Sequence, residues 1–85
     1  MTQVTLLTKP ACPLCDQAKL TLGRLAQDFD LALELVALDS DQGRALATAA
    51  GMPFPPGVLI DGQPFSYGRL SERKLRRALE SRERR

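Results

Sequence analysis

The chain runs from a short apolar segment into a helical pattern through its only two cysteines, Cys12 and Cys15, which have C-x-x-C spacing. The segment Val4–Thr8 is rich in β-forming residues and ends at a Lys-Pro pair, so it predicts a buried first strand. From Pro13 onward, apolar residues recur at three- and four-residue steps, which predicts a helix. These residues are Leu14, Ala18, Leu22 and Leu25. A strand that leads through C-x-x-C straight into a helix is typical of a thiol–disulfide redox site.

The spacing of the two cysteines has a chemical consequence. With Cys12 near the N-cap and Pro13 at the first helical position, Cys15 falls one turn further along, and the two sulfur atoms can close a small ring. Unpaired N–H groups and the partial positive charge of a helix N-terminus favour the thiolate form of Cys12. Because only a thiolate attacks disulfides, we expect Cys12 to be the nucleophile and Cys15 to be the resolving thiol.

A second strand and a second helix are predicted in the middle of the chain. The leucines of the apolar run Leu31–Leu38 would also suit a helix. The run is short, however, and lies between two helical patterns, so we interpret it as a strand. Residues Asp39–Gln42 supply N-cap chemistry for a short helix that ends at Gly51.

The last part of the chain predicts a hairpin and a helix. Gly57–Ile60 has the pattern of a third strand, and Asp61-Gly62 is a typical two-residue turn into a fourth strand at Gln63–Tyr67. Ser71 is placed to cap a final helix. The apolar face of that helix carries Leu75, Ala78 and Leu79. We interpret the charged segment Glu80–Arg85, with Arg82, Arg84 and Arg85, as the frayed and solvated end of this helix.

The predicted order is therefore β-α-β-α-β-β-α, in one domain that spans residues 1–85. The first two strands are expected to be parallel and joined by a right-handed helical crossover. The hairpin adds two antiparallel strands. The expected fold class is α/β, with a mixed four-stranded sheet flanked by helices.

Composition narrows the classes of function. The formal net charge is +2, with acidic and basic residues mixed, which is too weak a bias to indicate nucleic acid or an anionic membrane as a partner. No apolar run reaches the length of a membrane span, and the N-terminus lacks the pattern of a signal peptide. We therefore expect a cytoplasmic monomer. In a reducing compartment, two cysteines are more often catalytic or metal-binding than a structural disulfide.

Two segments resemble glutaredoxins and small glutaredoxin-like proteins of the thioredoxin-fold superfamily. Lys9–Cys15 is similar to the glutaredoxin active-site segment, with Leu14 where a tyrosine is common. Pro56–Gly62 is similar to the family's Pro-x-Val-x-Ile-x-Gly stretch. The resemblance covers roughly Gln3–Glu80. It implies a thioredoxin fold and a thiol–disulfide oxidoreductase that reduces protein or mixed disulfides.

The chain also departs from the patterns of both thioredoxins and glutaredoxins. Ala11 stands where thioredoxins have a tryptophan. Gly68 is followed by Arg-Leu-Ser-Glu in place of the glycine–aspartate turn that holds the γ-glutamyl end of glutathione. Pro55 has no N–H, although family members align the substrate with the backbone of this residue. The segment Tyr67–Arg76 resembles a small glutaredoxin-like subfamily.

The resemblance assigns roles residue by residue. The catalytic residues are Cys12 and Cys15. The expected substrate-binding residues are Lys9, Pro13, Leu14, Pro55, Pro56 and Gly68. Pro56 is expected to have a cis peptide bond and to face the sulfur atoms. Glutathione or another low-molecular-weight thiol is a possible co-substrate, and no cofactor or metal is expected.

Several of these residues keep a simpler interpretation. Lys9 could lower the pKa of Cys12 and meet a substrate carboxylate, or it could be an ordinary exposed lysine. Leu14 could lie at the rim of the site, which we favour, or pack in the core. For Gly68 and Ser71, a turn and a helix cap are favoured over an anion site.

Alternatives to a glutathione-dependent enzyme also remain. The protein could be a redoxin that is reduced by thioredoxin reductase or by a non-glutathione thiol. It could be a metal or iron–sulfur carrier, although the chain has no histidine and no third cysteine. It could also be a binding module that kept the fold without the activity.

Overall fold

A four-stranded mixed sheet with the strand order β2-β1-β3-β4 organises the molecule. The structure is a computed structural model that describes residues 1–83. Its elements are β1 (Thr2–Thr8), α1 (Pro13–Asp28), β2 (Leu31–Ala37), α2 (Asp41–Ala50), β3 (Gly57–Ile60), β4 (Gln63–Tyr67) and α3 (Glu72–Glu83). β1 is parallel to β2 and antiparallel to β3, and β3 is antiparallel to β4. The predicted order and the mixed sheet are confirmed.

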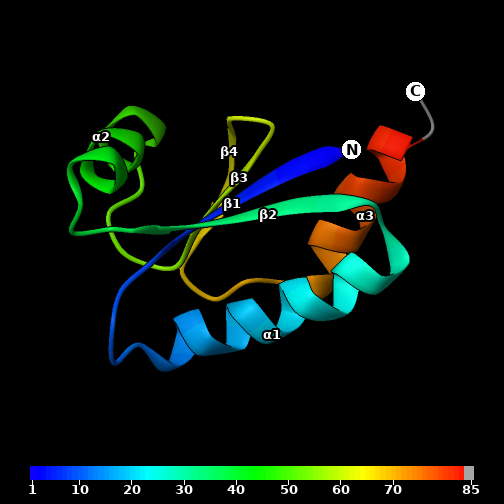
Figure 1. Ribbon diagram of the computed structural model, residues 1–85, viewed down its shortest axis with the longest axis horizontal. Helices are drawn as coiled ribbons and strands as arrows, with labels where there is room; N and C mark the ends of the chain where they lie inside the picture. The colour runs from blue at the N-terminus through cyan, green and yellow to red at the C-terminus, as the bar shows by residue number, and fades with distance from the viewer. Residues whose placement is uncertain (84–85) are drawn as a thin grey trace.

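Helices cover both faces of this sheet. α1 and α3 lie on one side, and the short α2 lies on the other (Figure 1). None of the helices within residues 1–83 is long and apolar enough to span a membrane.

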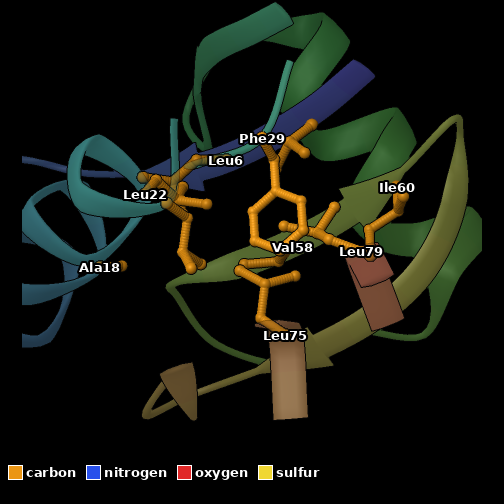
Figure 2. Close-up of a cluster of buried hydrophobic side chains, with 10 residues drawn as sticks. Leu6, Ala18, Leu22, Phe29, Val58, Ile60, Leu75 and Leu79 are labelled. Carbon is orange, nitrogen blue, oxygen red and sulfur yellow. The ribbon is translucent and has the colours of Figure 1, made fainter. Parts of the chain in front are cut away.

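The larger of two hydrophobic clusters lies between the sheet and the helices α1 and α3. Alternate residues of β1 and β3 meet apolar side chains from the two helices there, and Figure 2 shows these side chains converging. The members of this cluster that are at most 2 % exposed are Val4, Leu6, Ala18, Leu22, Leu25, Val58, Ile60, Leu75 and Leu79. Apart from Leu14, the predicted apolar faces of α1 and α3 are therefore the faces that pack.

A smaller cluster fills the opposite face of the sheet, under α2. It contains Leu7, Val36, Ala47, Met52 and Leu59. Because side chains alternate along a strand, the consecutive residues Leu6 and Leu7 belong to different clusters. This explains why Val4, Leu6 and Leu7 are all buried: β1 lies inside the sheet and is covered on both faces.

The predicted cap residues lie at both ends of α2 and at the start of α3. The Ser40 hydroxyl accepts a hydrogen bond of 2.9 Å from the Gly43 N–H at the start of α2. Gly51 ends this helix in the left-handed conformation, with φ of 68°. Ser71 caps α3 in the same way as Ser40 caps α2, by accepting a bond from the Lys74 N–H at 3.2 Å.

One feature of the surface was not predicted, and one prediction needs correction. β2 is a strand, but its leucines do not all pack: Leu33 and Leu35 are 42 % and 57 % exposed, because β2 is an edge strand. The end of α3 is not simply solvated, since Arg82 forms an ion pair of 2.7 Å with Asp61 in the β3–β4 turn. Arg84 and Arg85 lie outside the described residues.

Candidate redox site

Cys12 and Cys15 form a disulfide at the start of α1, with their Cα atoms 5.2 Å apart. Cys12 is the N-cap residue, with extended backbone angles, and Pro13 occupies the first helical position. Pro13 is well suited to this position because its missing N–H would have no partner within the helix. The local sequence therefore places the two sulfur atoms one turn apart on a preformed scaffold.

The two sulfur atoms differ in their access to solvent. Cys15 is 0 % exposed, whereas Cys12 is partly exposed. Cys15 is buried because it follows the same helical face as Ala18 and Leu22, which pack against the sheet. An external thiol or disulfide can therefore reach Cys12, whereas Cys15 is reached through Cys12.

The backbone at the start of α1 places a hydrogen-bond donor beside Cys12 Sγ. The Cys15 N–H donates a hydrogen bond of 3.1 Å to Cys12 Sγ. A hydrogen bond from a helix N-terminal amide stabilises a thiolate more than a thiol. The same sulfur atom therefore receives both the hydrogen bond and the partial charge of the helix end.

Ala11 holds a backbone conformation that the sequence did not indicate. Its φ is +54°, although it is not a glycine, and it lies in the turn directly before Cys12. L-residues other than glycine, asparagine and aspartate rarely adopt this region. The positive φ reverses the chain between the end of β1 and the N-cap of α1. An alanine at position 11 gives no indication in the sequence that its φ is positive.

The loop before β3 lies at the same end of the sheet as the cysteines. Gly57 pairs with Leu7, so Pro56 lies beside the end of β1, from which the chain leads to Cys12. The Pro55–Pro56 peptide bond is cis, which is the geometry implied by the resemblance, and Pro56 is buried. The fold thus brings together two segments that are far apart in the sequence.

Gly68 is engaged within the protein. Its N–H donates a 2.9 Å hydrogen bond to the Pro56 carbonyl, and its φ is 77°. A Cβ added to Gly68 would lie 3.0 Å from Cε2 of Phe54. With the Ser71 hydroxyl used as a cap, these contacts favour the turn-and-cap interpretation over an anion site.

The remaining candidates are placed on the surface. Lys9 is exposed and forms no ion pair with other residues between 1 and 82. Leu14 is half-buried and belongs to neither hydrophobic cluster. Pro13 is exposed, and Pro55 is partly exposed.

An aromatic pair near Gly68 was missed by the sequence reasoning. The rings of Phe54 and Tyr67 pack edge to face with centroids 5.1 Å apart, and both residues are about half exposed. Their positions on either side of β3 in the sequence give no signal that they meet. Among residues 1–83, no group of three or more His, Cys, Asp or Glu side chains is placed to hold a metal ion.

Comparisons with known proteins agree with this geometry. The fold resembles an asparagine-to-glutamine mutant of thioredoxin from Halobacterium salinarum NRC-1, with a TM-score of 0.74 and 25% identity over 94% of this chain and 73% of that chain. It also resembles oxidised mitochondrial thioredoxin 3 from Saccharomyces cerevisiae, with a TM-score of 0.70 and 16% identity over 94% and 77% of the two chains.

A comparison with curated proteins found no significant match. Residues 3–80 match the family described as Glutaredoxin-like domain (DUF836). This match and the paired cysteines at the helix N-terminus support a redox function. The chain has a thioredoxin fold and belongs to the family of glutaredoxin-like domains.

Proposed function

We propose that the protein is a thiol–disulfide oxidoreductase that reduces protein or mixed disulfides through Cys12 and Cys15. The observation that supports this most directly is the asymmetry of the pair. Cys12 is partly exposed and its Sγ accepts a hydrogen bond from the helix N-terminus, while Cys15 lies buried one turn behind it. We expect the reaction to take place in the cytoplasm, where thiols are kept reduced.

The reaction has two displacement steps. In the reduced protein, the Cys12 thiolate attacks one sulfur of the target disulfide and forms a mixed disulfide. The other target sulfur leaves as a thiolate and takes up a proton. Cys15 then loses its proton and attacks Cys12 Sγ, which releases the second target thiol and forms the Cys12–Cys15 disulfide. Two electrons pass to the target, and a thiol or a reductase returns them to the protein.

The surroundings of Gly68 favour a reductant other than glutathione. Pro55 has no N–H to offer a bound peptide. The Gly68 N–H already bonds to Pro56, and Phe54 covers Gly68. A redoxin that is served by thioredoxin reductase, or by a different small thiol, is therefore the second candidate. Turnover with each reductant in separate assays distinguishes the two.

The first test is the pKa of the Cys12 thiol, measured as the rate of alkylation against pH in the reduced protein. Cys12→Ser and Cys15→Ser identify which thiol reacts. We expect a pKa clearly below the ordinary value of about 8.5, because the helix N-terminus stabilises the thiolate. An ordinary or raised pKa would contradict the oxidoreductase proposal and favour metal carriage or a binding role.

A further inference from the structure

The outer edge of β2 is an unusually unprotected sheet edge. β2 comes first in the strand order and, within residues 1–83, pairs with β1 alone. Its seven residues contain one charged side chain, Glu34, and neither proline nor lysine. Proteins normally protect such an edge with lysine, proline or a bulge, because its free N–H and C=O groups can pair with another chain.

Apolar side chains lie exposed beside this edge. In the strand register, Leu33 and Leu35 lie opposite Val4 and Leu6 of β1, which pack against α1. The side chains of the two leucines therefore lie on the face of the sheet that α1 covers. With Lys19 and Leu22 of α1 they line a hollow of about 300 Å³.

A second hollow of about 290 Å³ is also lined by Lys19 and Leu35, and it continues to Lys9 and Pro10. Because the two hollows share residues, they form one surface between α1 and the edge of β2. We name it the β2 trough, lined by Lys9, Pro10, Lys19, Leu22, Leu33 and Leu35.

The charges in the β2 trough are all of one sign. Lys9 and Lys19 are exposed, and neither forms an ion pair with any of the residues that the structure describes. In the register of β1 and β2, Glu34 lies opposite Thr5. Its side chain is therefore on the other face of the sheet, away from Leu33 and Leu35. The trough therefore offers apolar contacts, two exposed lysines and the outer edge of a strand.

The β2 trough is continuous with the redox site. It ends at Lys9 and Pro10, and Pro10 is two residues before Cys12. A chain that lies along β2 can therefore extend toward the accessible sulfur atom. A second copy of this chain is a poorer occupant, because its own trough would bring two further lysines in place of acidic groups.

We propose that the β2 trough docks an extended segment of a partner protein whose trough-facing residues are apolar at one end and acidic at the other. The segment adds as a strand to the free edge of β2, and every second side chain faces the trough, because side chains alternate along a strand. Its apolar side chains contact Leu33 and Leu35, and its carboxylates meet Lys9 and Lys19. That this partner also carries the disulfide reduced at Cys12 rests on the proposed function. The docking itself does not.

The test is a titration of the ¹⁵N-labelled protein, with its disulfide intact, by synthetic peptides of the same length as β2. In one peptide, the side chains at alternate positions are two leucines followed by two glutamates, with threonine between them. In the control, lysine replaces both glutamates. We expect the acidic peptide to shift the amide signals of Leu33 and Leu35. Because its two glutamates meet Lys9 and Lys19, the acidic peptide should bind roughly fivefold more tightly than the control, with a smaller ratio at high salt.

A charge reversal makes the test specific. In Lys19→Glu the preference between the two peptides should shrink or invert, whereas in Lys19→Arg it should be retained. Equal binding of both peptides, or shifts that avoid β2, would overturn the proposal. Concentration-dependent self-association that Leu33→Lys abolishes would overturn it too, in favour of a second copy. Because binding is measured without turnover, failure here and failure of the thiol pKa test are distinguishable.

Discussion

At the scale of single residues, the two cysteines are chemically identical and acquire different roles from their positions. Cys12 is the N-cap of α1 and stays partly exposed. Cys15 lies one turn further along, on the buried face of the helix. Both positions follow from the local sequence, because Pro13 sets the helix start and apolar periodicity sets its buried face. The positive φ of Ala11 does not follow from it.

Two glycines test how the backbone conformation sets stability at single residues. Gly23 lies within α1 and Gly51 ends α2 at φ of 68°, and an added Cβ would meet no atom within 4 Å at either position. Gly23→Ala should raise the free energy of unfolding by about 0.5–1 kcal/mol, because alanine restricts the unfolded chain and favours helix. Gly51→Ala should lower it by about 1 kcal/mol, because of the left-handed φ.

Urea unfolding of the two variants measures both values. Both variants replace a glycine by an alanine, so each variant is the control for the other. Two shifts of the same sign would contradict this explanation.

At the scale of elements, ion pairs join α1 to α3. Arg24 donates to Glu72 at 2.7 Å, and Arg76 donates to Asp28 at 3.0 Å. The Arg76 guanidinium also lies 5.6 Å from the centroid of the Phe29 ring. These contacts join two helices that are far apart in the sequence.

The Arg24–Glu72 contact predicts a dependence of stability on pH. The hydrogen bond from Arg24 and its charge lower the pKa of Glu72 below its ordinary value, although burial opposes this. Because the folded pKa is the lower one, the stabilisation is present above the ordinary value. It is lost as the pH falls through the folded pKa.

Glu72→Gln should therefore weaken the loss of stability between neutral pH and about pH 3, as measured by urea unfolding. Glu34→Gln serves as a control, because Glu34 forms no ion pair with any residue from 1 to 82. An unchanged acid response in Glu72→Gln would show that the contact does not contribute in solution.

The β3–β4 turn is joined to two other elements through Asp61. Its Oδ1 accepts from the Gln3 N–H at 2.9 Å, its Oδ2 accepts from Arg82 at 2.7 Å, and its φ is 49°. Asp61→Ala should cost about 2 kcal/mol, because it loses both bonds at a strained φ. Asp61→Asn keeps an acceptor and tolerates this φ, so it should cost less than about 1 kcal/mol. Equal thermal unfolding of the two variants would contradict these roles.

At the scale of the whole molecule, the sheet separates two hydrophobic clusters, and the larger one includes α3. Leu79 is 1 % exposed in that cluster, whereas Leu20 on α1 is 66 % exposed. Leu79→Ala should destabilise the protein by about 2–5 kcal/mol through lost burial and an unfilled cavity. Leu20→Ala should change the stability by no more than about 0.5 kcal/mol. Chemical denaturation compares them, and a small effect at Leu79 would contradict this packing.

The order of elements could be predicted because each carried its own local signal. Alternating apolar runs and caps such as Ser40, Gly51 and Ser71 depend only on neighbours a few residues away. The exposure of Leu33 and Leu35 could not be predicted in the same way. Their pattern is that of a buried strand, and only the place of β2 at the end of the sheet leaves them in solvent.

The sequence by itself determined the seven elements and the placement of both cysteines at the N-terminus of α1. Those features depend on contacts between residues close in the chain. The tertiary structure alone decided that Pro56 lies beside the end of β1, that Phe54 covers Gly68, and that Lys9 and Lys19 border one trough. These arrangements join residues up to about fifty positions apart, and their geometry is set by how the helices pack on the sheet.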